Sequence, residues 1–216
     1  MHALIDLAER LLGAGPDAGA GTGRDPTPEW TQIHDRFHAW AAQPGLRRTL
    51  RGHLQDLPTD AVAAVTSRSR ETTTHFAWCL RDRPDEPFSF WLHEYKPQYD
   101  WRPGYADSVH NHRYHFYSTL LRGEYLHELH DVTLDPVSDL IAAVALLDSS
   151  TCVTGDSGFL LASDFHRIPR SADGTMTFVV KSRQVNPWSL SFDPVTRTGH
   201  RHVPVETRLA DLANGM

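Results

Sequence analysis

The chain has 216 residues, 40% of them hydrophobic, which is enough to bury the core of one domain. Its net charge is −6 with histidine neutral, which argues against binding to the phosphate backbone of nucleic acids. No apolar run approaches the roughly 18 to 20 residues that a membrane-spanning helix needs. We therefore expect a globular protein whose partners are small molecules, neither nucleic acid nor membrane.

The cysteines and the amino-terminal stretch bear on the cellular compartment in which the protein is expected. Cys79 and Cys152 are far apart in sequence and lie in apolar surroundings, which is typical of buried thiols in a reducing compartment. The stretch "MHALIDLAERLLGAG" lacks the basic start and apolar centre of a signal peptide. We expect a cytoplasmic protein, as a monomer or a homodimer.

Residues 1–60 are predicted to be mostly helical. The first helix has an apolar stripe of Leu4, Ile5, Leu7, Leu11 and Leu12. Residues 13–28, rich in Gly, Ala and Pro, are predicted to form a flexible connection. A helix with one apolar face starts near Pro28, and a further helix is predicted over 45–57.

From about residue 70 the sequence consists of short runs rich in β-branched and aromatic residues, separated by Gly, Pro, Asp and Asn. Examples are "TTTHFAWCLRD", "FSFWLHEY", "TMTFVVKS" and "PWSLSFDP". Many short strands at this spacing predict a β-sandwich or barrel. The predicted fold class is all-β with an N-terminal helical segment, in a single domain with a barrel over 70–200 and a tail over 201–216.

Three histidines crowd the stretch "SVHNHRYH" (108–115). His110 and His112 are two residues apart, and alternate residues of a strand point to the same face, so both can reach one metal ion. The best candidate for a third ligand is His166, in "GFLLASDFHRIP", because it follows an apolar strand and precedes a turn. An isolated His-x-His pair is weak evidence, and the alternative is that these histidines are structural.

The ordered combination of several motifs strengthens the metal interpretation. These motifs are "WRPG" (101–104), "SVHNH" (108–112), "LLRGEYLHE" (120–128), "FHRI" (165–168) and "FDPVTRTGHRH" (192–202). With the helical N-terminal part, they resemble the cupin superfamily, and within it the cysteine dioxygenase type. The resemblance covers nearly the whole chain and is remote in the middle.

The resemblance implies a small antiparallel β-barrel that holds a mononuclear non-heme iron(II) through His110, His112 and His166. It also implies that O2 and a small polar substrate, bearing an amine, thiol or carboxylate, are the reactants. Zinc, nickel, manganese or copper can occupy such a site as well, because affinity alone does not select the metal.

The sequence departs from the family pattern at several positions. Phe116 falls where cupins carry a glutamate ligand and cysteine dioxygenases carry a crosslinking cysteine. His115 is a candidate fourth ligand only if a bulge turns it inward; a role in the pocket wall or in hydrogen bonding is the favoured alternative. The family arginine that binds the cysteine carboxylate is absent from "TTTHFAW", where His75 stands. These differences argue against cysteine itself as the substrate.

Three residues are candidates for catalysis. On "TMTFVVKS" the inward set is predicted to be Thr177, Val179 and Lys181, where the family has His and Tyr. Lys181 can present an ammonium group to a carboxylate or an oxygen species, unless it reaches solvent beyond the strand end. His115 and Tyr117 are the other two candidates, Tyr117 as part of an aromatic rim or, alternatively, of the core.

Other predicted strands and loops also contain histidines. His93 and Glu94 alternate across a predicted strand, so only one of them faces the barrel. "HELH" (127–130) is not the His-Glu-x-x-His motif of zinc proteases, and "HRH" (200–202) is expected to be exposed.

The function that these observations favour is an iron(II)-dependent dioxygenase acting on a small polar substrate other than free cysteine. One alternative is a metal-dependent cupin isomerase, lyase or decarboxylase. Another is a non-catalytic cupin that binds a metal or a small molecule.

Overall fold

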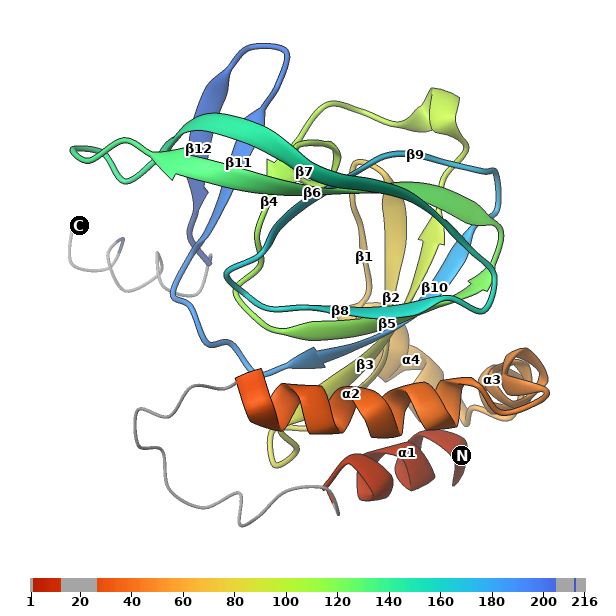
Figure 1. Cartoon of the computed structure of the whole chain (residues 1–216). Helices are drawn as coiled ribbons and strands as arrows, with labels where there is room; N and C mark the ends of the chain where they lie inside the picture. The colour runs from red at the N-terminus through yellow and green to blue at the C-terminus, as the bar shows by residue number, and fades with distance from the viewer. Residues whose placement is uncertain (1, 13–26, 205–211, 213–216) are drawn as a thin grey trace.

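A computed structural model describes residues 2–12, 27–204 and 212 (Figure 1). Nearly all of the predicted flexible connection and most of the predicted tail lie outside the described residues. No helix within the described ranges is long and apolar enough to cross a membrane.

The helical part comes first in the chain and contains α1 (His2–Leu12), α2 (Thr27–Ala41), α3 (Leu46–Gln55) and α4 (Thr59–Arg68). The apolar stripe of α1 is buried at Leu4, Leu7 and Leu11, whereas Leu12 is 44% exposed. The sequence predicts three of these helices. It does not predict α4, which has no buried residue and therefore shows no apolar periodicity.

The strands are β1 (Arg70–Glu71), β2 (His75–Asp82), β3 (Phe88–Tyr95), β4 (Val109–His110), β5 (Phe116–Arg122), β6 (Glu124–Leu134), β7 (Ile141–Val153), β8 (Ser157–Leu160), β9 (Phe165–Ser171), β10 (Met176–Ser182), β11 (Ser189–Asp193) and β12 (Thr198–His202). They form two antiparallel six-stranded sheets, in the orders β1-β2-β3-β10-β5-β8 and β12-β11-β4-β9-β6-β7. The sheets face each other across the barrel (Figure 1). The fold class is therefore the predicted all-β barrel with an N-terminal helical part.

The first sheet separates the helices from the barrel interior. On β10, Phe178 and Val180 belong to the core that contains α1, α2 and α3, while Val179 packs with Trp91 on the opposite face. This alternation follows from the two-residue period of a strand. One sheet thus has a helix-facing side and an interior side, and the interior side carries the polar groups discussed below.

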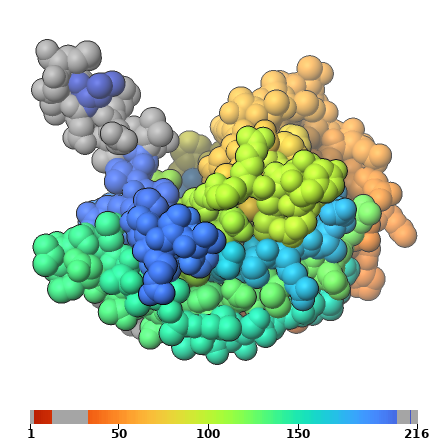
Figure 2. Space-filling view, turned by 90° about the horizontal axis from the view of Figure 1, so that it is seen from above, coloured from red at the N-terminus to blue at the C-terminus, as the bar shows by residue number. Residues whose placement is uncertain are grey.

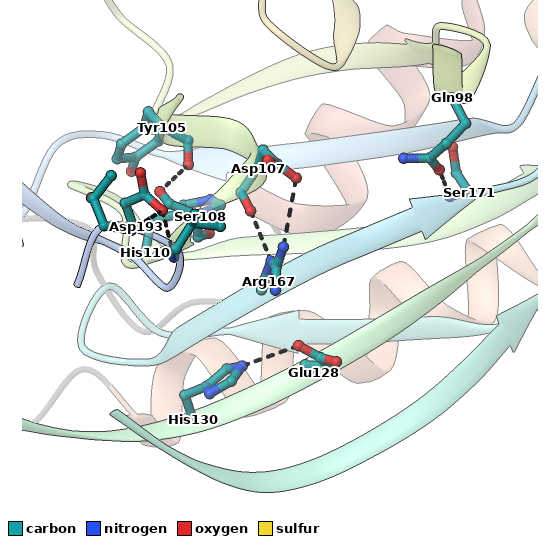
Figure 3. Close-up of polar contacts among 12 residues, drawn as sticks. Gln98, Tyr105, Asp107, Ser108, His110, Glu128, His130, Arg167, Ser171 and Asp193 are labelled. Atoms are coloured by element: carbon teal, nitrogen blue, oxygen red, sulfur yellow. Dashed lines mark hydrogen bonds and ion pairs between the residues drawn. The ribbon is translucent and has the colours of Figure 1, made fainter. Parts of the chain in front are cut away.

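The segment between β3 and β4 is hydrogen-bonded to β9 of the second sheet. Arg167 of β9 donates from Nε to the Asp107 carbonyl (2.8 Å), and the Ser171 amide donates to the Gln98 side chain (3.1 Å) (Figure 3). This segment includes the short 3-10 helices Gln98–Asp100 and Tyr105–Asp107. Seen from above, it lies beside β9 and the C-terminal strands (Figure 2). These bonds fix the point at which β4 begins.

Two glycines of the predicted motifs, Gly104 and Gly123, lie so close to a neighbouring threonine that a side chain would not fit. A Cβ on Gly104 would lie 2.9 Å from the Thr73 methyl group. A Cβ on Gly123, which connects β5 and β6 at φ +83°, would lie 2.4 Å from Thr175 Oγ1. Both positions therefore exclude any larger residue without a shift of the neighbouring strand.

Candidate metal centre

The three predicted metal ligands meet inside the barrel. His110 of β4 and His166 of β9 are direct cross-strand partners, and His112 lies just beyond β4. One nitrogen from each ring lies within 4.8 Å of the others. Nε2 of His112 and Nε2 of His166 are 2.9 Å apart. Two residues from one stretch and one from a stretch 54 positions later therefore converge on one point.

Outer hydrogen bonds orient two of these rings. His110 Nδ1 lies 2.8 Å from the Ser108 carbonyl, and His166 Nδ1 lies 3.1 Å from His127 Nε2. When each Nδ1 donates its hydrogen, each Nε2 carries a free lone pair directed to the common centre. This is the arrangement in which histidine serves as a metal ligand, because the second nitrogen holds the tautomer and the ring orientation.

The imidazoles are neutral near pH 7. Burial lowers the pKa of His110 to about 4 and the pKa of His112 and His166 well below the usual value, and the neighbouring rings lower all three further. Loss of hydration disfavours the charged form of a histidine. Neutral rings have the lone pair that a metal ion requires.

A phenyl ring lies beside two of the three histidines. The Phe116 ring centroid lies 4.9 Å from that of His112 and 5.8 Å from that of His166. The ligand group found among the described residues contains three histidines and no carboxylate. A divalent ion there would keep its full charge of +2, with positions left for other ligands.

A cavity with about 970 Å³ of empty space, including its open part, adjoins the three histidines. Its wall includes residues from both sheets. His75 of β2 and His93 of β3 stack at 4.4 Å between ring centroids, and both face it. Burial and the charge of Lys181 lower the pKa of His75 to about 3, and burial and His75 lower the pKa of His93. This wall therefore offers neutral imidazoles at physiological pH.

The structure places the predicted inward set of β10 in the cavity wall. Thr177, Val179 and Lys181 all line it. Lys181 is 4% exposed, so the alternative that it reaches solvent is wrong. His93 also lines the cavity, whereas Glu94 points to the other face and accepts a bond from Trp78 Nε1 (3.0 Å).

The other two catalytic candidates lie outside the cavity wall. Tyr117 is fully buried and stacks on Phe37 of α2 at 5.5 Å, because Phe116 faces inward and the next strand residue must face outward. His115 precedes β5, and its Nδ1 accepts a bond from the Ala162 amide (3.0 Å). The catalytic roles of His115 and Tyr117 stay predictions, and the bond from Ala162 agrees with the hydrogen-bonding role favoured for His115.

Sequence reasoning missed two features of the cavity. His127, in the "HELH" stretch, lines it and contacts His166, while His130 faces the outer side and lies 3.3 Å from Glu128 (Figure 3). Strand alternation from Tyr125 would have placed His127 inward. Cys152, a free thiol, also lines the cavity beside Tyr125, its cross-strand partner.

Only one residue of the second His-x-His pair, "HRH" (200–202), is exposed. His200 is exposed as predicted, but His202 lies 2.7 Å from Ser191 Oγ through its Nε2 and 4.7 Å from the Tyr105 ring. Of three other aromatic residues, Tyr114, Trp101 and Trp188, only Tyr114 lines the cavity. Trp101 donates to the Lys96 carbonyl instead, and Trp188 is 42% exposed.

The donor set fits a divalent metal ion. Two nitrogens bound at about 2.1 Å in adjacent positions of an octahedron are about 3 Å apart, close to the His112–His166 separation. Two unprotonated nitrogens at 2.9 Å would repel each other, and a cation bound by both removes that repulsion.

No family model matches this sequence. No curated protein matches it. Among solved structures, an oxalate decarboxylase of Bacillus subtilis is 15% identical over 68% of this chain and 34% of its own chain, with a TM-score of 0.37. A tryptophan-to-tyrosine variant of the same enzyme is 14% identical over 53% of this chain and 27% of its own, with a TM-score of 0.34. The chain spans about a third of the length of these proteins, and a likeness this weak carries no argument about activity.

Fold and site thus define an antiparallel β-barrel with a three-histidine group in its interior.

Proposed function

We propose that this protein is a non-heme iron(II)-dependent dioxygenase of the cysteine dioxygenase-like cupin type, with His110, His112 and His166 as its metal ligands. The observation that carries the proposal is the convergence of three neutral imidazoles beside a cavity, with Phe116 in place of a carboxylate ligand. When bound, iron(II) supplies the electrons and open coordination positions that a reaction between O2 and an organic substrate needs.

The chain's own residues would bind and orient the reactants. The cavity next to the histidines has room for a small polar molecule that donates a thiol, amine or carboxylate to the metal. Phe116 and Val179 keep water from one side of the site. The substrate is not expected to be free cysteine, because Val179 and Lys181 stand where the thiol dioxygenases carry His and Tyr.

The direct test combines metal content with O2 consumption. Protein reconstituted with iron(II) without oxygen should hold one metal per chain and consume O2 when a small thiol or amine substrate is added. His110→Ala should lose both properties, and His200→Ala, on the exposed pair, should lose neither. Absence of stoichiometric metal in the wild type, or equal metal in His110→Ala, would refute the proposal.

A second candidate is a reaction without O2, in which the metal acts only as a Lewis acid, as in a cupin isomerase, lyase or decarboxylase. Lys181 favours it, since an ammonium group facing the cavity can donate a proton to a carbanion. Turnover that is retained under argon would establish this candidate in place of the dioxygenase.

A further inference from the structure

Lys181 is a buried lysine in the middle of the helix-backed sheet. It lies on β10, level with Ser89 of β3 and Phe116 of β5, and its side chain faces the cavity. Its Nζ is 4.2 Å from the centroid of Trp91 and 5.2 Å from that of Tyr114. Aromatic faces attract an ammonium group, but they do not replace the hydrogen bonds that it loses on burial.

No carboxylate of the described residues forms an ion pair with Lys181. The groups facing it are Ser89 and Trp91 on β3, His75 and Cys79 on β2, Phe116 on β5, Tyr114 before β5 and Arg70 on β1. The ion pairs among the described residues include none with Lys181 or Arg70. Asp156 also lines the cavity, but its carboxylate accepts a bond from the Val153 amide (2.8 Å).

The other buried lysine shows the usual arrangement. Lys96 is 7% exposed, and its Nζ donates to the Glu71 carboxylate and to the Thr72 carbonyl (2.7 Å). Buried charges in proteins are normally paired in this way. Lys181 is therefore a buried amine that has no carboxylate ion-pair partner among the described residues.

The position of Lys181 relates it to the three histidines. The Tyr114 ring, which faces the Lys181 ammonium, also stacks on His112 at 5.2 Å between centroids. Phe116, level with Lys181 in the sheet, contacts His112 and His166. One cavity is thus lined by the three histidines, by the Tyr114 and Phe116 rings that contact them, and by Lys181.

We propose that Lys181 is the anion-binding residue of this cavity, and that the substrate is a small carboxylate-bearing molecule whose other end reaches the three-histidine centre. This inference rests on the proposed function and specifies its substrate class. A bound carboxylate would accept a charge-assisted hydrogen bond from Nζ and supply the missing counter-ion. The guanidinium group of Arg70 lies 5.4 Å from the Trp91 ring, which Lys181 also contacts, and it adds to the positive field around Lys181.

The test uses two thiols with chains of equal length, 3-mercaptopropionate, which ends in a carboxylate, and 3-mercapto-1-propanol, which ends in a neutral hydroxyl group. Cobalt(II)-loaded protein is titrated with each probe without oxygen, and the cobalt absorption bands report binding. Wild type should bind the carboxylate probe at least tenfold more tightly than the alcohol. Lys181→Met should abolish that preference, and Lys181→Arg should keep part of it. Arg122→Gln, which removes an exposed charge elsewhere on the barrel, should keep all of it.

A metal-free arm separates this inference from the proposed function. Ligand-observed NMR compares propionate with 1-propanol on metal-free wild type and Lys181→Met. A preference for propionate that disappears in Lys181→Met supports the anion site, whether or not cobalt binds. A failure of cobalt to bind would refute only the metal centre. Equal binding of the charged and neutral probes, or an unchanged preference in Lys181→Met, would overturn the inference.

Discussion

Lys181 affects stability as well as recognition. Burial, reinforced by Arg70, lowers its pKa from 10.5 to about 7, with a small opposing effect from Cys79. The unfolded chain therefore binds more protons than the folded chain between pH 7 and pH 10.5. Across this window the contribution of Lys181 makes the folded state more stable as the pH rises, and at or below pH 7 the full destabilisation is present.

Lys181→Met should accordingly stabilise the metal-free protein. The gain over wild type is expected to be largest at pH 6 and to shrink by on the order of 2 kcal/mol by pH 9. Urea unfolding at the two pH values measures it. His75 and His93 are neutral throughout this range because their pKa values are lowered, so they do not mask the effect. A variant less stable than wild type at pH 6 would contradict this account of Lys181.

His127 should act on metal affinity through His166. Its Nε2 is 3.1 Å from His166 Nδ1, so His127→Ala removes the group that holds the ring. Loss of such a partner typically weakens metal binding by about 10- to 100-fold. Competition with a chelator of known affinity measures the change. His130→Ala, on the outer face of the same strand, is the control and should leave the affinity unaltered.

At the scale of elements, strand β5 shows how the alternation of side chains along a strand decides which residues face the cavity and which face the helices. Its first residue, Phe116, contacts the ligand histidines, and its second, Tyr117, packs on α2. The sequence contains this information, since neighbouring residues of a regular strand cannot face the same side. Assigning Phe116 to the ligand layer already excluded Tyr117 from the cavity.

The turn after β5 should be intolerant of a side chain. Gly123→Ala combines a left-handed backbone with a Cβ 2.4 Å from Thr175 Oγ1 and 2.9 Å from Thr175 Cα, so we expect a loss of about 3 kcal/mol in the free energy of unfolding. Gly155→Ala has φ +101° but nothing within 4 Å, and should lose about 1 kcal/mol. Thermal or urea unfolding compares the two variants. Equal losses would show that the contact with Thr175 is unimportant.

At the scale of the whole molecule, metal binding should stabilise the barrel, because its ligands come from neighbouring strands that are distant in sequence. An ion at 100 times its Kd adds about 2.7 kcal/mol to the free energy of unfolding. Differential scanning calorimetry with and without iron(II) or cobalt(II) should show a raised Tm for wild type and no shift for His110→Ala. A metal-induced shift that survives in His110→Ala would place the ion elsewhere.

The sequence predicted much of the fold and the centre of the site, for physical reasons. Apolar periodicity and turn residues identified the strands and three helices, and the two-residue spacing placed His110 and His112 together. What the sequence could not show depends on contacts between distant segments. The hydrogen bond between His166 and His127 needs the β6–β9 pairing, and the hydrogen bond of His115 needs the Ala162 amide 47 residues away. Helix α4 left no signal because it buries nothing.

The helix-backed sheet has a consequence for how such a protein can change. Val179 and Lys181 line the cavity, while their strand neighbours Phe178 and Val180 pack in the core that contains the helices. Substitutions at the cavity-facing positions of β10 would therefore change the cavity wall and leave the helix-facing core in place.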